Sequence, residues 1–347
     1  MFVDIMRRKI FILSVTIYLF LFSCIQFKEH PSDSTTLKEE FLSSFLRNFT
    51  NNSIYQEAKG ILDDSFGNGS GYVYISGDNY GQSLAVQSNG KILLGGYCYN
   101  NSSGNRNFCI ARFNSNGTLD TSNFSYPYGY ILQPIGLSGD YGQSLAIQPD
   151  GKILLGGKCY NRSNSDFCIA RFNSNGTLDT SFGTGGKVIE PIGSLQDFGW
   201  SLAIQPDRKI LLGGNCDNGG GNYDFCIARF NSNGTLDTSF GTNGKVILPI
   251  SSLDHDIGYS LAIQPDGKIL LGGYCDGGSG WDFCIARFET NGTTLDTSFG
   301  TGGKIIQPIG SGDDKGNSLA IQPDGKILLG GHCNNGSNDD FCIARFK

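Results

Sequence analysis

The sequence predicts an all-β fold, a five-bladed β-propeller with four antiparallel strands in each blade. The first observation is an internal repeat. The Gly-Gly-x-Cys string at residues 95–98 recurs about every 58 residues, and its five copies fill residues 61–347. The second is that each copy holds four strand-like runs and no helical pattern. The third is the composition, with 50 Gly and 17% charged residues, which is too apolar for a disordered chain.

The strands of a blade are clearest in the fourth copy. Residues 244–250 form an outer strand, and residues 259–264 and 268–272 form a hairpin. The turn of this hairpin is Pro-Asp-Gly at residues 265–267, the residue types that tight turns prefer. Residues 283–288 form the remaining strand. In this order, each copy supplies the first three strands of one blade, and the next copy supplies its outer strand.

The two ends of the repeat array predict how the ring closes. The last copy stops at Lys347 and lacks an outer strand, whereas the first copy begins with a surplus strand at Gly71–Ile75. We expect this N-terminal strand to pair with Phe341–Phe346 of the last repeat, because closure removes exposed sheet edges. The structural alternative is an open or less regular ring.

Three strings that recur in the copies resemble a known family. They are Leu-Asp-Thr-Ser-Phe-Gly at 236–241, Gln-Pro-Asp-Gly-Lys at 264–268 and Ile-Ala-Arg-Phe at 285–288. They are similar to the delta-60 repeat, a bacterial β-propeller family of largely unassigned function. The resemblance covers residues 61–347. It implies the propeller fold and brings no catalytic residues.

The N-terminus is predicted to be a lipoprotein signal peptide at residues 1–23. Arg7, Arg8 and Lys9 precede an apolar run at 10–22, which is too short to span a bilayer comfortably. The run ends in Leu-Phe-Ser-Cys, which resembles the lipobox of bacterial lipoproteins, with Cys24 as the lipidated residue. The alternative is an ordinary secretory signal with an incidental cysteine.

A lipidated tether is predicted at residues 24–60. Apolar residues from Leu37 to Phe49 recur in it at helical spacing, which indicates a short amphipathic helix. We favour docking of this helix on the propeller over a position at the membrane surface.

The chain has 11 cysteines, and those in the repeats come in one pair per copy. Within a pair the two cysteines bound a loop, and no Cys-x-x-Cys cluster suggests zinc. Disulfides in an oxidising compartment are therefore expected, each contributing about 2.5–3 kcal/mol in the chain-entropy model. The predicted pairs are Cys98–Cys109, Cys159–Cys168, Cys216–Cys226, Cys275–Cys284 and Cys333–Cys342.

Each copy also carries one arginine near its end and one aspartate in its Leu-Asp segment. Because a site needed once is rarely built five times, we interpret these as structural Arg–Asp pairs rather than an anion-binding ring. The arginines are Arg112, Arg171, Arg229, Arg287 and Arg345, and the aspartates are Asp63, Asp120, Asp179, Asp237 and Asp296.

Composition and motifs exclude several functions. The net charge of −6 provides no basic stripe for nucleic acid. The glycine pairs precede no helix and lack the Gly-Lys-Ser/Thr of phosphate loops. No catalytic triad or twelve-residue calcium loop is recognisable. We therefore expect no catalytic residues, no metal and no cofactor.

The residues that vary between copies point to a binding face. Both tryptophans lie there among aromatic and acidic residues, which suits carbohydrate stacking or a protein interface. The alternative is that the tryptophans only fill gaps between blades. The candidate face comprises Tyr141, Asp197, Phe198, Trp200, Asp254, His255, Asp256, Trp281 and Asp313.

Together these observations predict an exported, monomeric propeller, anchored by lipid to the bacterial outer membrane on its periplasmic or surface side. Its expected role is non-catalytic binding or adhesion at the cell envelope, with a protein or carbohydrate ligand. One alternative is a carbohydrate-active enzyme, a glycosidase or lyase, with two loop acids about 5–10 Å apart at the channel. The other is a purely structural envelope protein.

Overall fold

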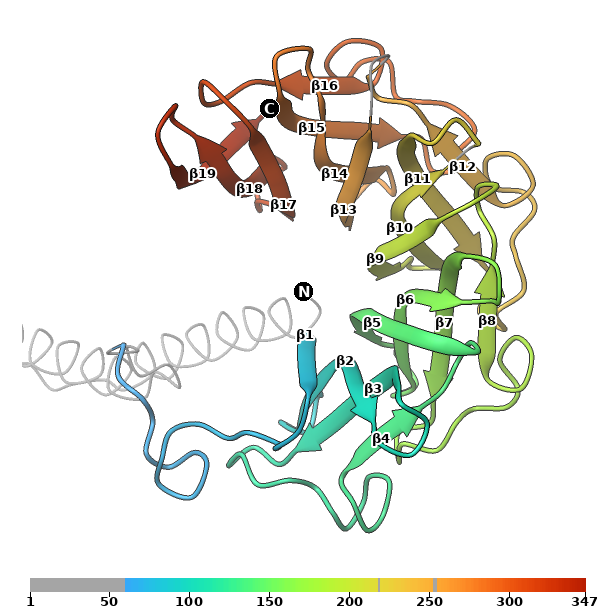
Figure 1. The fold of residues 1–347 in the computed structure, drawn as a ribbon, viewed down its shortest axis with the longest axis vertical. Helices are drawn as coiled ribbons and strands as arrows, with labels where there is room; N and C mark the ends of the chain where they lie inside the picture. The colour runs from blue at the N-terminus through green and yellow to red at the C-terminus, as the bar shows by residue number, and fades with distance from the viewer. Residues whose placement is uncertain (1–59, 218, 252–254) are drawn as a thin grey trace, which may run out of the picture. The chain divides into compact units, whose positions relative to one another are not determined.

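The computed structural model describes residues 60–347 apart from 218 and 252–254, and one compact unit spans Leu62–Lys347. Its elements in this range are all β-strands, grouped into five antiparallel sheets that we call blades 1 to 5 (Figure 1). The predicted signal peptide and nearly all of the predicted tether lie outside the described residues.

The strands of the blades have the following bounds. Blade 1 holds β1 (Asn79–Val86), β2 (Ile92–Asn100), β3 (Asn105–Phe113) and β4 (Tyr130–Gln133). Blade 2 holds β5 (Ser138–Ile147), β6 (Ile153–Tyr160), β7 (Ser165–Phe172) and β8 (Lys187–Glu190). Blade 3 holds β9 (Asp197–Ile204), β10 (Ile210–Asp217), β11 (Tyr223–Phe230) and β12 (Lys245–Leu248). Blade 4 holds β13 (Asp256–Ile263), β14 (Ile269–Asp276), β15 (Trp281–Phe288) and β16 (Lys304–Gln307). Blade 5 holds β17 (Asp314–Ile321), β18 (Ile327–Asn334) and β19 (Asp339–Phe346).

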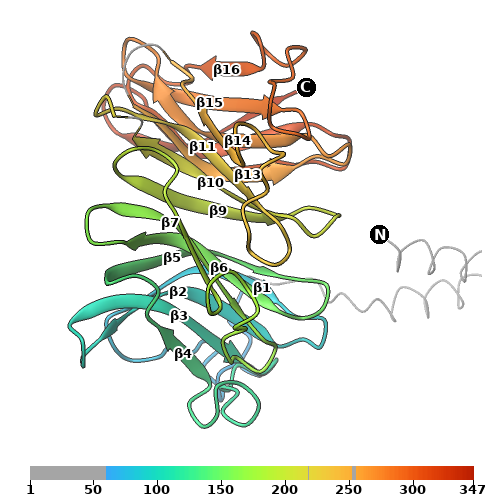
Figure 2. The ribbon, with the colours of Figure 1, turned by 90° about the vertical axis from the view of Figure 1, so that its right-hand side faces the viewer.

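The strand order within each blade follows the chain, which confirms the predicted assembly. In blade 2 the sheet order is β5-β6-β7-β8, and the outer strand β8 comes from the start of the next repeat. The blades succeed one another around an axis, with the first strand of each blade nearest to it (Figure 1), and Figure 2 shows the sheets side-on. The prediction of a five-bladed propeller with antiparallel blades is therefore confirmed.

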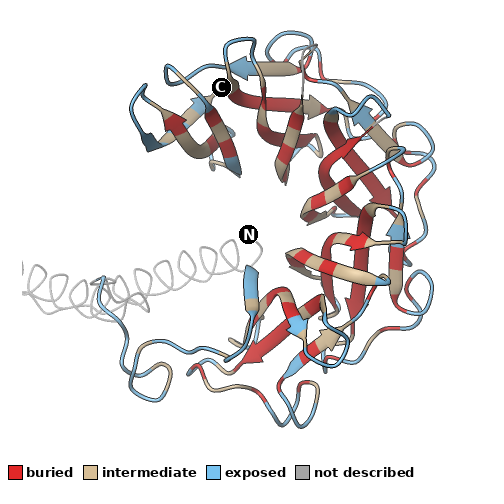
Figure 3. Cartoon of the chain, viewed as in Figure 1, coloured by how far each residue is buried: buried red, intermediate tan, exposed pale blue. Residues whose placement is uncertain are grey.

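The core lies between the blades rather than within them. Four apolar clusters each join two successive blades, and Figure 3 shows the buried positions along the facing sheets. Between blades 2 and 3, for example, Phe167 and Ile169 of β7 pack with Ile210 and Leu212 of β10. Every side chain in this example is completely buried. Because the repeats carry the same apolar residues, equivalent side chains pack against each other at each junction between blades.

The hairpin turn between the first two strands requires a left-handed residue. Gly151 and Gly267 occupy this position with φ of 83° and 89°. In the third repeat Arg208 takes the same position with φ of 70°. Since a side chain disfavours this conformation, Arg208 costs about 1–2 kcal/mol relative to glycine.

All five predicted disulfides form. Each joins the second and third strands of one blade, with Cα–Cα distances such as 5.5 Å for Cys98–Cys109 and 5.9 Å for Cys159–Cys168. Five disulfides in one domain are typical of an oxidising, extracytoplasmic compartment. Among the described residues, no helix is long and apolar enough to cross a membrane.

The predicted closure of the ring does not form. Gly71–Ile75 is not a strand, and the sheet of blade 5 ends at β19 with three strands. The N-terminal segment instead docks on blade 1, where the Gly67 amide donates to the Asn116 carbonyl at 2.9 Å. Glycines with positive φ, including Gly69 and Gly71, bend this segment out of the extended conformation that pairing requires. As a result, β19 is an unpaired edge.

Candidate functional site

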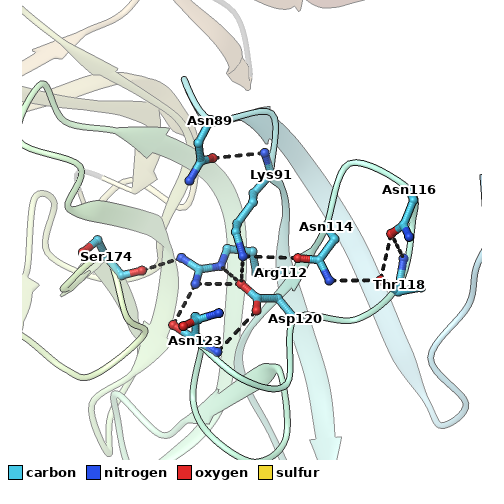
Figure 4. Close-up of polar contacts among 9 residues, drawn as sticks. All are labelled: Asn89, Lys91, Arg112, Asn114, Asn116, Thr118, Asp120, Asn123 and Ser174. Atoms are coloured by element: carbon cyan, nitrogen blue, oxygen red, sulfur yellow. Dashed lines mark hydrogen bonds and ion pairs between the residues drawn. The ribbon is translucent and has the colours of Figure 1, made fainter.

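The Arg–Asp pairs form in blades 1 to 4 and belong to the framework. In blade 1 the Arg112 Nε donates to Asp120 Oδ2 at 2.8 Å (Figure 4). The guanidinium lies 4.6 Å from the Phe124 ring. The same arginine also donates to the Ser174 carbonyl on the next blade, and Lys91 pairs with the same Asp120 oxygen. The buried arginines of blades 1 to 3 therefore each connect two blades.

The pKa of the paired aspartate is lowered in blades 2, 3 and 4 alike. Hydrogen bonds from Lys268 and Ser298, with the charge of Arg287, hold the pKa of Asp296 well below its usual range. The fifth predicted pair does not form. Asp63 accepts from Ser65 instead, at 2.6 Å, and Arg345 is exposed at the open edge.

Two acids of the predicted face, Asp197 and Asp256, are structural. Both are completely buried. Asp197 accepts the Ile192 amide at 2.6 Å and the Gly193 amide at 3.0 Å, and Asp256 accepts the Ile250 amide at 2.6 Å. Asp140 and Asp314 make the same bonds in blades 2 and 5. These carboxylates hold the connection that enters each first strand, so neither Asp197 nor Asp256 faces a ligand.

Burial raises the pKa of Asp197 to about 6, although its two amide donors oppose the shift. The folded state therefore holds a proton that the unfolded state has released between about pH 4 and 6. We expect the free energy of unfolding to fall as pH rises through this window, by about 2–3 kcal/mol for this group. Asp197→Asn should remove that component, while Asp150→Asn on an exposed turn should not. Urea denaturation at pH 4, 5, 6 and 7 measures both, and an unchanged pH profile for Asp197→Asn would contradict the assignment.

The aromatic members of the predicted face lie close to one another. They belong to a run of rings that we call the aromatic belt, formed by Tyr80, Tyr97, Tyr141, Phe198, Trp200, Tyr223, His255, Tyr259, Tyr274 and Trp281. Most lie at the start of a first strand, the end of a second or the start of a third. Because neighbouring strands are antiparallel, these three ends meet at one rim of the propeller.

Ring contacts cross two of the blade junctions, between blades 1 and 2 and between blades 3 and 4. Tyr97 of blade 1 meets Tyr141 of blade 2 at 5.0 Å between centroids, and Trp200 of blade 3 meets Tyr259 of blade 4 at 5.0 Å. Tyr223 and His255 are 5.1 Å apart across the same junction. All the rings remain partly exposed. The belt is therefore a set of rings that contact one another and are partly accessible to solvent.

A β-bulge positions Trp200. In the ladder between β9 and β10, Gly199 pairs with Gly214 and Ser201 with Gly213, so Trp200 has no partner. The unpaired residue of a bulge is re-aimed relative to its strand. The Trp200 indole then donates to Asn215 Oδ1 at 2.7 Å, which fixes the ring. Tyr259 occupies the equivalent unpaired position in blade 4.

Asp313 is exposed, and its carboxylate accepts the Trp281 amide at 3.2 Å, which places it beside the belt. Asp254 lies outside the described residues. Tyr80, Tyr97, Tyr259 and Tyr274 are not among the predicted residues, because they lie in strands rather than in the variable loops. Comparing the repeats position by position could have identified these residues, because they lie at equivalent positions in different copies.

A cavity of about 880 Å³ lies against blade 1, where no neighbouring blade covers the sheet. It is lined by Tyr72, Leu84 and Leu94 among others, and it lies where the other blades have a junction. Among the described residues, no group of three or more His, Cys, Asp or Glu side chains could hold a metal ion.

Comparisons with known proteins agree with this architecture. Five segments, residues 87–122, 148–182, 205–240, 264–299 and 322–347, match the family described as "Domain of unknown function (DUF5122) beta-propeller". No curated protein matches the chain.

Solved structures that resemble the chain do so at low identity. A protein of unknown function from Dyadobacter fermentans has 13% identity and a TM-score of 0.44, covering 75% of this chain and 77% of its own. An endo-arabinase from Bacteroides thetaiotaomicron has 11% identity and a TM-score of 0.39, covering 78% and 95%. A sucrose-6-phosphate hydrolase from Lactobacillus gasseri has 15% identity and a TM-score of 0.42, covering 76% and 58%. The activities named for these proteins are theirs alone.

Proposed function

This chain carries five β-propeller repeats of the DUF5122 type, and on that premise we propose that it is a non-catalytic carbohydrate-binding module of the bacterial envelope. The observation that carries the proposal is the aromatic belt. Its rings are partly exposed, lie on one rim and contact each other across two of the blade junctions.

The belt has the physical properties of a binding platform. Aromatic faces offer a large apolar area with few rotatable bonds, so they lose little conformational entropy when a ligand stacks on them. Trp200 is further held by its bond to Asn215, and the rings restrain one another. A rigid, elongated platform suits a polysaccharide chain better than a small molecule that needs an enclosing pocket.

The proposed location follows from the disulfides together with the N-terminal sequence. The disulfides are typical of an exported protein. We propose that Cys24 is lipidated and that residues 24–60 tether the propeller to the outer membrane.

Alanine substitutions of the two tryptophans test the function. Trp200→Ala and Trp281→Ala should each weaken retention by a polysaccharide at least ten-fold, because each removes a central stacking face. Affinity electrophoresis in gels containing laminarin, xylan or polygalacturonate measures retention, and reducing-end release from the same polymers reports hydrolysis. Tyr128→Ala is the matched control, since Tyr128 is 62% exposed and lies outside the belt.

Thermal melts establish that the variants are folded. Retention of a polymer by wild type and loss of that retention by both folded tryptophan variants would support the proposal. Unchanged retention by the folded variants, retention of none of the polymers by wild type, or release of reducing ends would overturn it.

A further inference from the structure

We propose that Lys158 gives the belt a preference for anionic polysaccharides, by binding the carboxylate of a uronic acid whose sugar ring stacks on Phe198 and Trp200. This inference rests on the proposed function and names its ligand class. The Lys158 ammonium lies 4.2 Å from the Phe198 centroid, 5.1 Å from Tyr141 and 5.6 Å from Trp200.

Lys158 differs from the repeated lysines of the blades. Those of the hairpin turns pair with aspartates, as Lys152 does with Asp179 at 2.9 Å. Those of the outer strands donate to proline carbonyls, as Lys187 does to Pro134 at 2.6 Å. Within the described part of the chain, Lys158 has neither an ion pair nor a hydrogen-bond acceptor for its ammonium. Its three donors are therefore available to a ligand.

The surroundings of Lys158 make an incoming anion favourable. Burial lowers the pKa of Lys158, because the rings around it displace water without supplying a counter-charge. A carboxylate that reaches the ammonium relieves this desolvation and forms a charge-assisted hydrogen bond. The aromatic faces hold the positive charge in place until then.

The position of Lys158 also indicates a role in specificity rather than in folding. Lys158 pairs with Tyr141 in the ladder between β5 and β6. The equivalent residues of the other blades are Tyr97, Asn215, Tyr274 and His332, so the fold does not require a lysine here. The guanidinium carbon of a second cation, Arg106, lies 5.8 Å from the centroid of the same Tyr141 ring. A polymer with a charge on every sugar could contact both, whereas the net charge of −6 disfavours nucleic acid.

The test uses two polymers that share a backbone and differ in charge. Polygalacturonate carries a carboxylate on each sugar, and its methyl-esterified form has the same backbone without the charge. We expect wild type to bind polygalacturonate about ten-fold more tightly than the ester, and Lys158→Met to abolish this preference. Methionine retains the unbranched stem that packs against the rings. Lys187→Met is the matched control, because it removes a lysine from an outer strand.

The outcomes separate this inference from the proposed function. Loss of the preference in Lys158→Met but not in Lys187→Met, together with a loss of the wild-type preference at 0.5 M salt, supports it. A preference that survives Lys158→Met overturns it. Retention of the ester or another neutral polymer that needs Trp200 but shows no charge preference also overturns it, while the proposed function stands. Binding to none of the polymers removes both.

Discussion

Replacement of Arg229 by methionine is expected to lower the free energy of unfolding by about 3 kcal/mol or more, whereas the same change at Arg345 should have almost no effect. Arg229 is buried, and its Nε donates to Asp237 at 2.7 Å. Its Nη1 donates to the Thr290 carbonyl of the next blade at 2.8 Å. Without the guanidinium, Asp237 keeps Lys209, at 2.9 Å, as its one charged partner among the described residues, and the bond between blades is lost.

Arg345 provides the matched control because it occupies the same position of the repeat. It is exposed at the end of β19, and within the described residues it has no ion pair. Chemical denaturation of wild type, Arg229→Met and Arg345→Met under identical oxidising conditions measures the difference. Equal losses in the two variants would contradict the structure, because they would require Arg345 to be buried with a partner of its own.

The repeat explains why the fold could be predicted in such detail. A residue type that recurs at the same position in all five copies, such as the cysteines or the arginines, is rarely there by chance. Each such residue therefore indicates a structural role at that position of the blade. The same logic failed at Asp197 and Asp256. Asp197 lies five residues after an isoleucine, as Asp140 and Asp314 do, and Asp256 lies six residues after one, so the four acids that make the same bonds are nearly aligned in the sequence. What the sequence does not show is that these carboxylates are buried against backbone amides.

The candidate site was only partly predictable because it depends on register between strands. Tyr97 and Tyr141 are far apart in sequence and meet only when blades 1 and 2 pack. The bulge that aims Trp200 is likewise a property of the β9–β10 ladder. The sequence places a lysine at this position of the repeat in blade 2 alone, but it does not show which groups surround the Lys158 ammonium. Its lack of a carboxylate partner becomes visible only in three dimensions.

Blade 5 has no neighbouring blade beyond it, so the same phenylalanine of the repeat is buried in blade 4 and exposed in blade 5. Removing it should therefore change the free energy of unfolding very differently in the two blades. Phe283 of β15 is completely buried in the cluster between blades 4 and 5. Phe341 holds the same position in β19 and is fully exposed. We expect Phe283→Ala to cost about 3–5 kcal/mol of stability, because it removes a buried ring and leaves a cavity. Phe341→Ala should change stability by less than about 0.5 kcal/mol.

Denaturant unfolding of both variants decides whether the last face is free in solution. A cost for Phe341→Ala as large as that for Phe283→Ala would mean that another surface covers β19. The first sheet of the chain offers such a surface, since Leu84 and Val86 are 64% and 62% exposed on it. If blade 1 of the same molecule were the cover, the measured stability would not depend on protein concentration. If a second copy were the cover, stability would rise with concentration, because association stabilises the folded state by mass action. A small cost at Phe341 would mean that β19 is uncovered in solution, and the aromatic belt then ends at blade 4 rather than continuing around a closed ring.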